Sequence, residues 1–298
     1  MRNFLFALLF TCFSAATHAQ LLYRISGNGL QRPSYIVGTY HLAPASFADS
    51  IPGLRTVQEQ CEQVYGELEI NALLNPDSTA LVQQAMLLPE GMKLSQILTP
   101  EEMKRVKDYA QKKFGFTASI LMQQAERMTP IGLTTQFELL NCVMKTGQID
   151  VSNVLDISLQ RDAQKSGKMT GGLESLSLQM NVLYQGKSME RQKQLLLCLV
   201  DHSDFDDMMT DSIIKSYFAQ DLEGVKNAMD MKMDNDCDNT PDEEEQVISG
   251  RNANWMVQMP AIMQAKSTLF VVGAGHLPGE KGVLNLLRQA GYQVEACK

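Results

Sequence analysis

Two histidines of this chain stand in the same local setting, directly after a glycine-bearing strand end. His41 closes the segment 38–41 (Gly-Thr-Tyr-His) and His276 closes the segment 273–276 (Gly-Ala-Gly-His), each after a short apolar run. Glycine permits unusual backbone angles or a close approach, and open α/β sheets place their ligands at the carboxyl ends of their strands. One such histidine more often makes a structural hydrogen bond, but the repeated arrangement favours one shared polar site. Imidazoles within about 8 Å of each other could share one ion through bonds of ~2 Å.

Glu67 and Glu69 are acidic residues that could act with these histidines. They alternate on a strand predicted over 63–70, so both side chains would point to one face of the sheet. Two acids on one face of a central strand are costly to bury unless they bind a cation or share a proton. An edge strand with a solvated face is the alternative, although the apolar pair Val64 and Tyr65 argues against it.

Three more candidates lie between the two glycine–histidine segments. Glu174 follows the glycine pair at 171–172, after a short predicted strand, and Arg251 and Asn252 lie on a helix predicted to begin at Pro241. An arginine could hold a carboxylate or a phosphate through two parallel hydrogen bonds. An ordinary surface salt bridge is the alternative for this arginine.

The elements that must position these residues are strands at both ends of the chain and helices in the middle. The apolar run 268–272, bounded by glycine, is typical of a strand buried on both faces. A helix over 279–290 then leads to a last strand, which is the order of a parallel crossover unit. We predict strands over 21–26, 34–37, 63–70, 268–272 and 292–296, the first two joined by a turn at 27–29. Helical signals dominate an insertion of roughly residues 77–235, within one α/β domain over 20–298.

The first 19 residues predict a secretory signal peptide and therefore export. Arg2 gives a positive start, an apolar run follows over 4–13, and Thr17 and Ala19 are small residues at the −3 and −1 positions of a cleavage site after Ala19. The apolar run is too short to span a bilayer, and no later run reaches that length. We expect a periplasmic or extracellular protein without a membrane span.

The cysteines are relevant to the predicted export, because an oxidising compartment outside the cytoplasm allows disulfides. The cysteines after the predicted signal peptide are Cys61, Cys142, Cys198, Cys237 and Cys297. None belongs to a CxxC pair, so a structural zinc site is not expected. Cys237 in a polar loop and Cys297 at the terminus are the first choice for a disulfide. The alternative is that all five are small buried apolar residues.

Composition and missing motifs exclude several classes of function. The formal net charge is −8 and no cluster of lysine and arginine is present, which argues against nucleic-acid binding. The sequence also lacks the GxSxG elbow of serine hydrolases, the HExxH helix of zincins and the glycine-rich loops of nucleotide-binding folds. A hydrolytic site in this chain must therefore have another construction.

Five segments resemble, in order, the motifs of the TraB/GumN family, to which the Tiki-type metal-dependent proteases are related. They are residues 35–41 (Tyr-Ile-Val-Gly-Thr-Tyr-His), 66–70 (Gly-Glu-Leu-Glu-Ile), 172–175 (Gly-Leu-Glu-Ser) with Gln179, Arg251-Asn252 with Trp255, and 272–279 (Val-Gly-Ala-Gly-His-Leu-Pro-Gly) with 291–294. Glu69 stands where the family usually has aspartate. The closing segment is the most specific of the five, and the acidic segment is the weakest.

The resemblance implies both a fold and a reaction. The fold is a mixed central β-sheet flanked by helices, related to the erythromycin-esterase and ChaN-like folds, with a mostly helical insertion. The reaction is peptide hydrolysis with a divalent metal, manganese or cobalt, although imidazole and carboxylate ligands would also suit zinc or iron. The expected metal ligands are His41, Glu67, Glu69 and His276.

The other candidates receive catalytic roles from the same resemblance. Glu174 would be the general base or a further ligand, and Arg251 beside Asn252 would stabilise the developing oxyanion or bind a substrate carboxylate. The substrate would be a peptide or another small molecule. The alternative is a non-catalytic binding protein that uses the same cleft for a small ligand, haem or a cell-envelope partner, because histidines also ligate haem iron.

Overall fold

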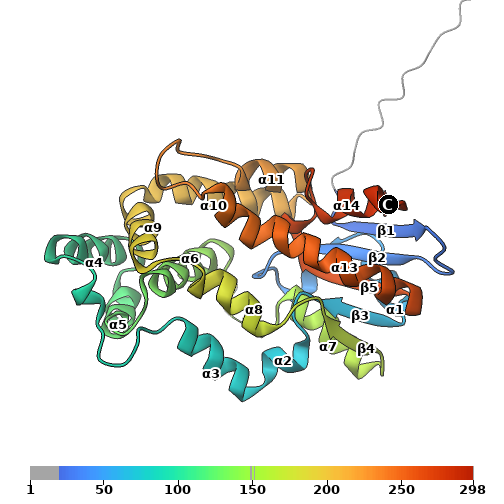
Figure 1. Ribbon diagram of the computed structural model, residues 1–298, viewed down its shortest axis with the longest axis horizontal. Helices are drawn as coiled ribbons and strands as arrows, with labels where there is room; N and C mark the ends of the chain where they lie inside the picture. The colour runs from blue at the N-terminus through green and yellow to red at the C-terminus, as the bar shows by residue number, and fades with distance from the viewer. Residues whose placement is uncertain (1–19, 148–149, 151, 298) are drawn as a thin grey trace, which may run out of the picture.

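The computed structural model describes residues 20–147, 150 and 152–297. The predicted signal peptide, residues 1–19, lies outside the described residues. In the folded part that the structure describes, a β-sheet lies at one side of the molecule and a group of helices lies at the opposite side (Figure 1). Among the described residues, no helix combines the length and the apolar character needed to cross a bilayer.

Within the described chain, six strands form one mixed sheet in the order β4-β3-β5-β2-β1-β6. The strands are β1 (Leu22–Gly27), β2 (Ser34–Thr39), β3 (Gln63–Gly66), β4 (Met169–Gly172), β5 (Thr268–Gly273) and β6 (Tyr292–Ala296). Neighbours from β4 to β2 are parallel, whereas β1 is antiparallel to both β2 and β6. The predicted α/β fold with a mixed central sheet is therefore confirmed.

The end of the chain forms the predicted crossover unit. Because β1 is antiparallel to both β2 and β6, β6 runs in the same direction as β5, with β2 and β1 between them. The connecting helix α14 (Val283–Gln289) begins later than the predicted start at residue 279. Gly279 has a φ of +88°, which a right-handed helix does not allow, so the loop must turn there first.

The acidic strand is shorter than predicted. β3 ends at Gly66, where a Cβ would lie 2.8 Å from the carbonyl O of Leu68. The chain therefore turns sharply after a glycine that has no space for a side chain, and Glu69 becomes the N-cap of α2 (Ile70–Leu74). The prediction that Glu67 and Glu69 share one sheet face is wrong, because alternation of side chains needs a continuous strand.

Helices fill the connections between the strands. Between β2 and β3 lie η1 (Ala45–Ser50) and α1 (Leu54–Gln60). Between β3 and β4 lie α2, α3 (Pro76–Ala85), η2 (Leu94–Gln96), α4 (Pro100–Phe114), α5 (Phe116–Ala125), α6 (Pro130–Thr146) and α7 (Leu155–Lys165). Between β4 and β5 lie α8 (Leu176–Met180), η3 (Asn181–Gln185), α9 (Met189–Asp201), α10 (Ser203–Phe218), α11 (Leu222–Met229), α12 (Pro241–Glu244), η4 (Glu245–Ser249) and α13 (Gly250–Ala265). β4 interrupts the predicted helical insertion, because it pairs with β3 in the central sheet.

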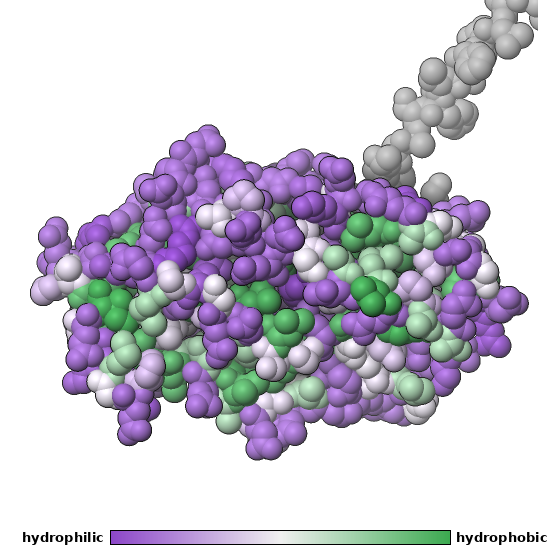
Figure 2. All heavy atoms as spheres, in the orientation of Figure 1, coloured by the Kyte–Doolittle hydropathy of each residue, from purple (hydrophilic) through white to green (hydrophobic). Residues whose placement is uncertain are grey.

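Separate apolar cores stabilise the sheet and the helical end. The sheet core contains the apolar residues of β2, β3 and β5 and the fully buried Trp255 of α13. The core of the helical end lies among α4, α5, α6 and α9, where Tyr109, Phe114 and Phe137 pack ring against ring. Figure 2 shows that polar residues cover most of the visible face and that apolar residues form small, separate patches. The sheet core therefore fixes the strand ends that carry the candidate residues.

A disulfide between Cys198 and Cys237 joins α9 to the loop before α12, with 5.6 Å between the Cα atoms. The predicted pair Cys237–Cys297 is wrong, because Cys297 follows β6 at the sheet, where its N–H donates to the carbonyl O of Leu22. The helix α9 lies at the other end of the molecule (Figure 1). The free cysteines of the described chain are Cys61, Cys142 and Cys297. A disulfide is consistent with a secreted or extracellular protein, since oxidising compartments preserve it.

Candidate active site

The candidate site lies where three neighbouring parallel strands end. β5 pairs with β2 on one side and with β3 on the other. The register places Thr39 opposite Gly273 and Gly66 opposite Val271. Because the carboxyl ends of parallel strands meet at one edge of a sheet, the residues after all three strands come together. They supply His41, Glu67 and His276.

Gly273 marks the point on which these three side chains converge. A Cβ on Gly273 would lie 3.2 Å from Glu67 Oε1, 3.5 Å from His276 Cδ2 and 4.0 Å from His41 Nε2. His276 Cδ2 and His41 Nε2 each lie within 4.0 Å of this Cβ position, so the distance between them is at most twice that value. The structure therefore brings the two imidazoles together. A side chain at this position would enter the space among them, which is a physical reason for glycine at the end of β5.

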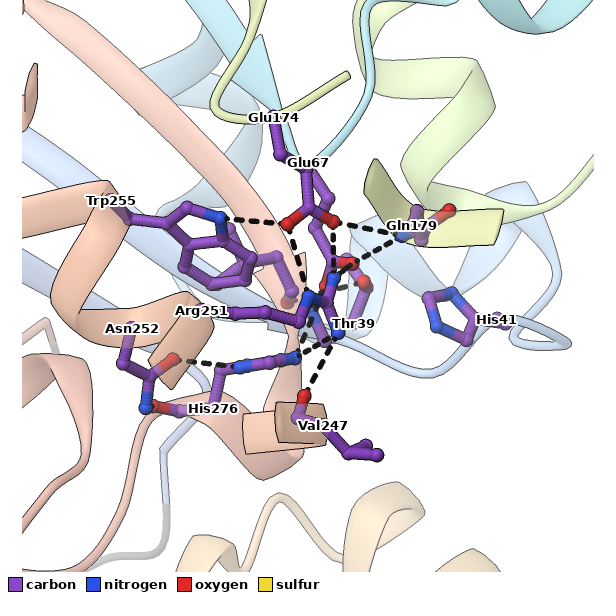
Figure 3. A network of polar contacts seen from close by, with 12 residues as sticks. Thr39, His41, Glu67, Glu174, Gln179, Val247, Arg251, Asn252, Trp255 and His276 are labelled. Atoms are coloured by element: carbon purple, nitrogen blue, oxygen red, sulfur yellow. Dashed lines mark hydrogen bonds and ion pairs between the residues drawn. The ribbon is translucent and has the colours of Figure 1, made fainter. Parts of the chain in front are cut away.

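Arg251 occupies the centre of the site, with only 7% of its side chain exposed. Its Nε and Nη2 donate to the two oxygens of Glu174 at 3.0 and 2.5 Å, and Nη2 also donates to Glu67 Oε2 at 2.5 Å. Its Nη1 donates to the Val247 carbonyl O at 3.2 Å and to His276 Nε2 at 3.0 Å (Figure 3). Burial would lower the pKa of Arg251, but the bonds to both carboxylates raise it. These contacts use all five N–H groups of the guanidinium.

His276 is a buried imidazole whose tautomer is set by its neighbours. Arg251 can only donate, so His276 Nε2 accepts and Nδ1 carries the proton, which it donates to Asn252 Oδ1 at 2.7 Å. Burial lowers the pKa of His276 to about 4, so the ring is neutral at pH 7. The Asn252 amide also donates to the carbonyl oxygens of His276 and Lys281, and the Trp255 ring packs 4.4 Å from the imidazole, centroid to centroid. Asn252 thus positions His276.

Glu67 is a buried carboxylate that keeps its charge. Its Oε1 accepts from the Gly273 N–H at 2.7 Å, and its Oε2 accepts from Gln179 Nε2 at 3.2 Å as well as from Arg251. Burial would raise the pKa of this carboxyl, but His276, His41, Arg251 and the Gly273 N–H lower it to about 2. Because Oε1 also lies 3.9 Å from His276 Nε2, it is the oxygen that faces the histidines.

His41 differs from the other members because its side chain is 71% exposed. Its Nδ1 lies 2.9 Å from Asp156 Oδ2, and this hydrogen bond raises the pKa of His41 to about 9. Nδ1 is hydrogen-bonded to Asp156, and the other ring nitrogen, Nε2, faces the space beside Gly273 and Glu67. Nothing in the sequence marked Asp156, because an acidic residue in the first turn of a helix such as α7 is ordinary.

Glu69, predicted as a further metal ligand, is not among the residues that line the cavity beside His41 and Glu67. Its carboxylate accepts from the Ala72 N–H at 3.1 Å, from Asn71 Nδ2 at 2.8 Å and from Thr170 Oγ1 at 3.0 Å. These contacts cap α2 and connect it to β4, so both oxygens of Glu69 already accept hydrogen bonds there. The end of β3 at Gly66 is the reason for this placement.

Glu174 lies inside the site, but both of its oxygens already accept hydrogen bonds. Its side chain is 2% exposed. Besides Arg251, Gln179 Nε2 donates to Oε1 at 3.1 Å and Trp255 Nε1 donates to Oε2 at 3.3 Å. A general base must reach the proton that it removes, directly or through one water. This geometry suits Glu174 to holding Arg251 better than to acting as a general base.

The donor set has the chemistry of a transition-metal site, because imidazole and carboxylate suit several divalent ions. His41 Nε2 and Glu67 Oε1 face the same space beside Gly273. Nevertheless, within the part of the chain that the structure describes, no three or more His, Cys, Asp or Glu side chains are grouped so as to hold an ion. In addition, His276 Nε2 accepts a hydrogen bond from Arg251, so this nitrogen is not free to bind an ion. His41 and Glu67 supply ligand types that suit a metal, His41 once it has released the proton on Nε2, and His276 would join them only by releasing Arg251.

Several residues of the site line a cavity of about 580 Å³. Its lining includes His41, Asp156, Glu67, Arg251 and His276, together with many apolar side chains. Cavities of about 300–1,000 Å³ with a few polar groups and apolar walls are the usual form of a small-molecule or substrate site. The arrangement can thus hold an organic substrate against His41 and Glu67.

Proteins similar to this chain are known in animals. The chain is 26% identical over 305 residues to the metalloprotease TIKI1 of Danio rerio, covering 88% of this chain and 60% of that protein. It is 26% identical over 309 residues to the metalloprotease TIKI1 of Homo sapiens, covering 88% of this chain and 59% of that protein. It is 23% identical over 324 residues to a metalloprotease TIKI homolog of Amphimedon queenslandica, covering 95% of this chain and 62% of that protein.

The match covers most of this chain but only part of its relatives. The chain spans about 60% of the length of the curated relatives it matches. No solved structure matches it with significance. The family model described as TraB/PrgY/gumN matches residues 21–296, which is nearly the whole described chain. This chain therefore belongs to the TraB/PrgY/gumN family.

Proposed function

We propose that this chain is an exported, metal-dependent hydrolase, specifically a peptidase, that acts in the periplasm or outside the cell. The observation that carries the proposal is the convergence of His41 Nε2 and Glu67 Oε1 beside Gly273, in the lining of a cavity. Similarity to proteins named metalloproteases supports the same class of reaction. Manganese or cobalt is the proposed metal, and the ligand types are also compatible with zinc or iron.

The proposed metal ligands are His41 and Glu67, with His276 as the third. A bound divalent cation supplies Lewis-acid chemistry, which activates water and polarises a carbonyl group. Asp156 orients His41 through Nδ1 and keeps Nε2 directed at the cavity, as carboxylates behind ligand histidines commonly do. Glu69 has no part in this proposal, because its oxygens are committed to the cap of α2.

Arg251 and Glu174 receive supporting roles in this proposal. All five N–H groups of Arg251 are used, so no donor is free for an oxyanion or a substrate carboxylate. The oxygens of Glu174 are likewise occupied. We assign this pair the task of balancing the charge of Glu67 and of fixing the tautomer of His276, which keeps both groups in place for the reaction.

A non-catalytic binding protein is the second candidate, and one observation favours it. Arg251 takes His276 Nε2, so only two of the proposed ligands face the cavity freely. Such a site could bind a small ligand, haem or a cell-envelope partner without turnover. A visible absorption band on addition of haem, without any peptide hydrolysis, would support this candidate, because exposed His41 could ligate haem iron.

Hydrolysis of peptides with added metal tests the first candidate. The protein is stripped with a chelator and assayed on quenched fluorescent peptides with manganese, cobalt, zinc or no ion. We expect metal-stimulated turnover by the wild type and a loss of at least about 100-fold in His41→Ala and in His276→Ala. Circular dichroism verifies that both variants fold. Full metal-stimulated turnover by both variants would contradict the proposal.

A further inference from the structure

Six partly exposed apolar side chains line the site cavity, and we call them the apolar collar. The collar consists of Ile157 on α7, Leu183 on η3, Ile213 on α10, Met229 on α11, and Val247 and Ile248 on η4. They come from five elements of the described chain that are far apart in sequence. Apolar side chains that stay exposed and gather around a cavity are typical of a binding surface.

The charged groups of the site cavity are paired with one another. Asp156 bonds to His41, and Arg251 bonds to Glu67. The collar itself contributes no charged side chain. A charged substrate group that entered the collar would lose water without gaining a partner, which is costly. An apolar group would instead exchange water for apolar contacts, which is favourable.

Two π-helical turns carry half of the collar. Leu183 lies in η3, and Val247 and Ile248 lie in η4, where α8 and α12 continue as π-helix. Such turns make up well under 1% of residues in proteins and occur frequently at functional sites. The Val247 carbonyl in η4 accepts from Arg251 Nη1. The turn η4, which presents two collar side chains, therefore also binds Arg251 through a backbone hydrogen bond.

Met229 lies between the site cavity and a second, larger cavity of about 1,040 Å³. Both cavities are lined by Leu183, Met229, Val247, Ile248 and Gly275. A Cβ on Gly275 would lie 2.6 Å from the sulfur of Met229, so the methionine packs directly on the segment that carries His276. The two cavities are therefore neighbours that share part of their lining, including a flexible side chain that adapts its shape easily.

We propose that the substrate is an extended peptide with an apolar side chain beside the bond that is cleaved. That side chain lies in the apolar collar, and the rest of the peptide crosses Met229 into the larger cavity. This inference rests on the proposed function, because the bond must reach His41 and Glu67. The shared lining of the two neighbouring cavities supports an extended occupant, and the uncharged collar supports the apolar side chain.

Peptides that differ at one position test this inference. A set of quenched peptides carries Leu, Met, Phe, Lys or Asp at the varied position, and mass spectrometry locates the cleaved bond. Wild-type protein is expected to cleave at apolar residues with a kcat/KM at least about tenfold higher than at charged ones. Met229→Lys is expected to reverse the order of Leu and Asp peptides. Met208→Lys is the matched control, because Met208 is an exposed methionine on α10 outside both cavities.

The failure of this inference can be told apart from the failure of the proposed function. Equal cleavage of apolar and charged peptides by the wild type, or the same preference in Met229→Lys, would overturn the inference and leave the peptidase proposal intact. Fluorescence anisotropy of the same peptides with metal-free protein adds a reading that needs no turnover. Tighter binding of the Leu peptide than of the Asp peptide, without cleavage, would support the collar and contradict the peptidase. Equal binding without cleavage would contradict both.

Discussion

At the residue scale, one arginine decides what the other polar groups of the site can do. Arg251 donates to both oxygens of Glu174, to Glu67 Oε2, to His276 Nε2 and to the carbonyl O of Val247. Its five donors are then exhausted. His41, held from behind by Asp156, and the Oε1 oxygen of Glu67 are consequently the groups left to meet a metal or a substrate.

Glu67 and Glu69 form a natural comparison, because they are the same residue type two positions apart. Glu67→Ala is expected to reduce metal-stimulated hydrolysis by at least about 100-fold and to remove the thermal stabilisation by manganese or cobalt. Glu69→Ala removes a helix cap, so it should cost about 1 kcal/mol of stability and leave activity near the wild-type value. Enzyme assays and metal-dependent melting curves of both variants provide the measurement. Equal losses of activity would show that the structural assignment of Glu69 is mistaken.

Removal of the arginine should destabilise the fold. Arg251→Met leaves Glu67 and Glu174 as buried charges without their cation, which is expected to cost about 3–5 kcal/mol of unfolding free energy. Arg55→Met is the control, because the Arg55 side chain is 42% exposed, and it should stay within about 0.5 kcal/mol of the wild type. Urea denaturation measures both values. A variant with Glu174→Gln added to Arg251→Met should regain part of the loss, and no regain would argue against this explanation.

At the element scale, the site depends on strand ends, on two π-helical turns and on a disulfide-linked loop. The parallel ends of β2, β3 and β5 bring the histidines and Glu67 together. The π-helical turns η3 and η4 present collar side chains. The Cys198–Cys237 disulfide holds the loop before α12 against α9, on the wall of the larger cavity.

Loss of this disulfide should lower stability through the unfolded chain. Its cysteines are 39 residues apart, and closing a loop of that length is worth about 3–4 kcal/mol in the chain-entropy account. We expect the variant with Cys198→Ala and Cys237→Ala to lose about that much in urea denaturation. Cys142→Ala, which removes a free thiol, should change little. Added reductant should bring the wild type to the level of the double variant, and an unchanged wild type would contradict the assignment.

At the scale of the whole molecule, the buried polar site makes the fold sensitive to acid. The pKa of His276 is lowered by burial from 6.5 to about 4, so the unfolded chain takes up a proton before the folded chain does. The contribution of His276 to stability is therefore full above pH 6.5 and falls as the pH drops toward 4. The lowered pKa of Glu67 acts in the same direction, from pH 4.5 toward about 2.

The expected acid effect can be measured with a single variant. Between pH 6.5 and 4.5 the unfolding free energy of the wild type should fall by on the order of 2–3 kcal/mol through His276. In His276→Gln that part of the pH dependence should disappear, whatever its stability at neutral pH. Urea titrations at several pH values give the slope of unfolding free energy against pH for the wild type and for His276→Gln. Identical slopes in wild type and variant would mean that His276 is not buried in its neutral form.

The sequence alone determined the class of fold and the strands that begin and end the chain, and it suggested candidate residues for the site. Apolar runs that end in glycine are local signals, so β2, β5, His41 and His276 could be predicted from their immediate neighbours. The extent of the acidic strand could not, because the sharp turn after Gly66 depends on contacts that no local pattern expresses.

Tertiary structure alone decided which side chains face one another. Asp156 meets His41 across 115 positions of sequence, and Arg251 meets Glu67 across 184. The pairing of Cys198 with Cys237 likewise depends on where α9 packs. Hydrogen bonds and ion pairs of this kind depend on distances and angles between remote elements, which the packing of the cores sets. For this reason the sequence could suggest candidate residues such as His41, Glu67 and His276, whereas Asp156 and the contacts of every candidate became visible only in the fold.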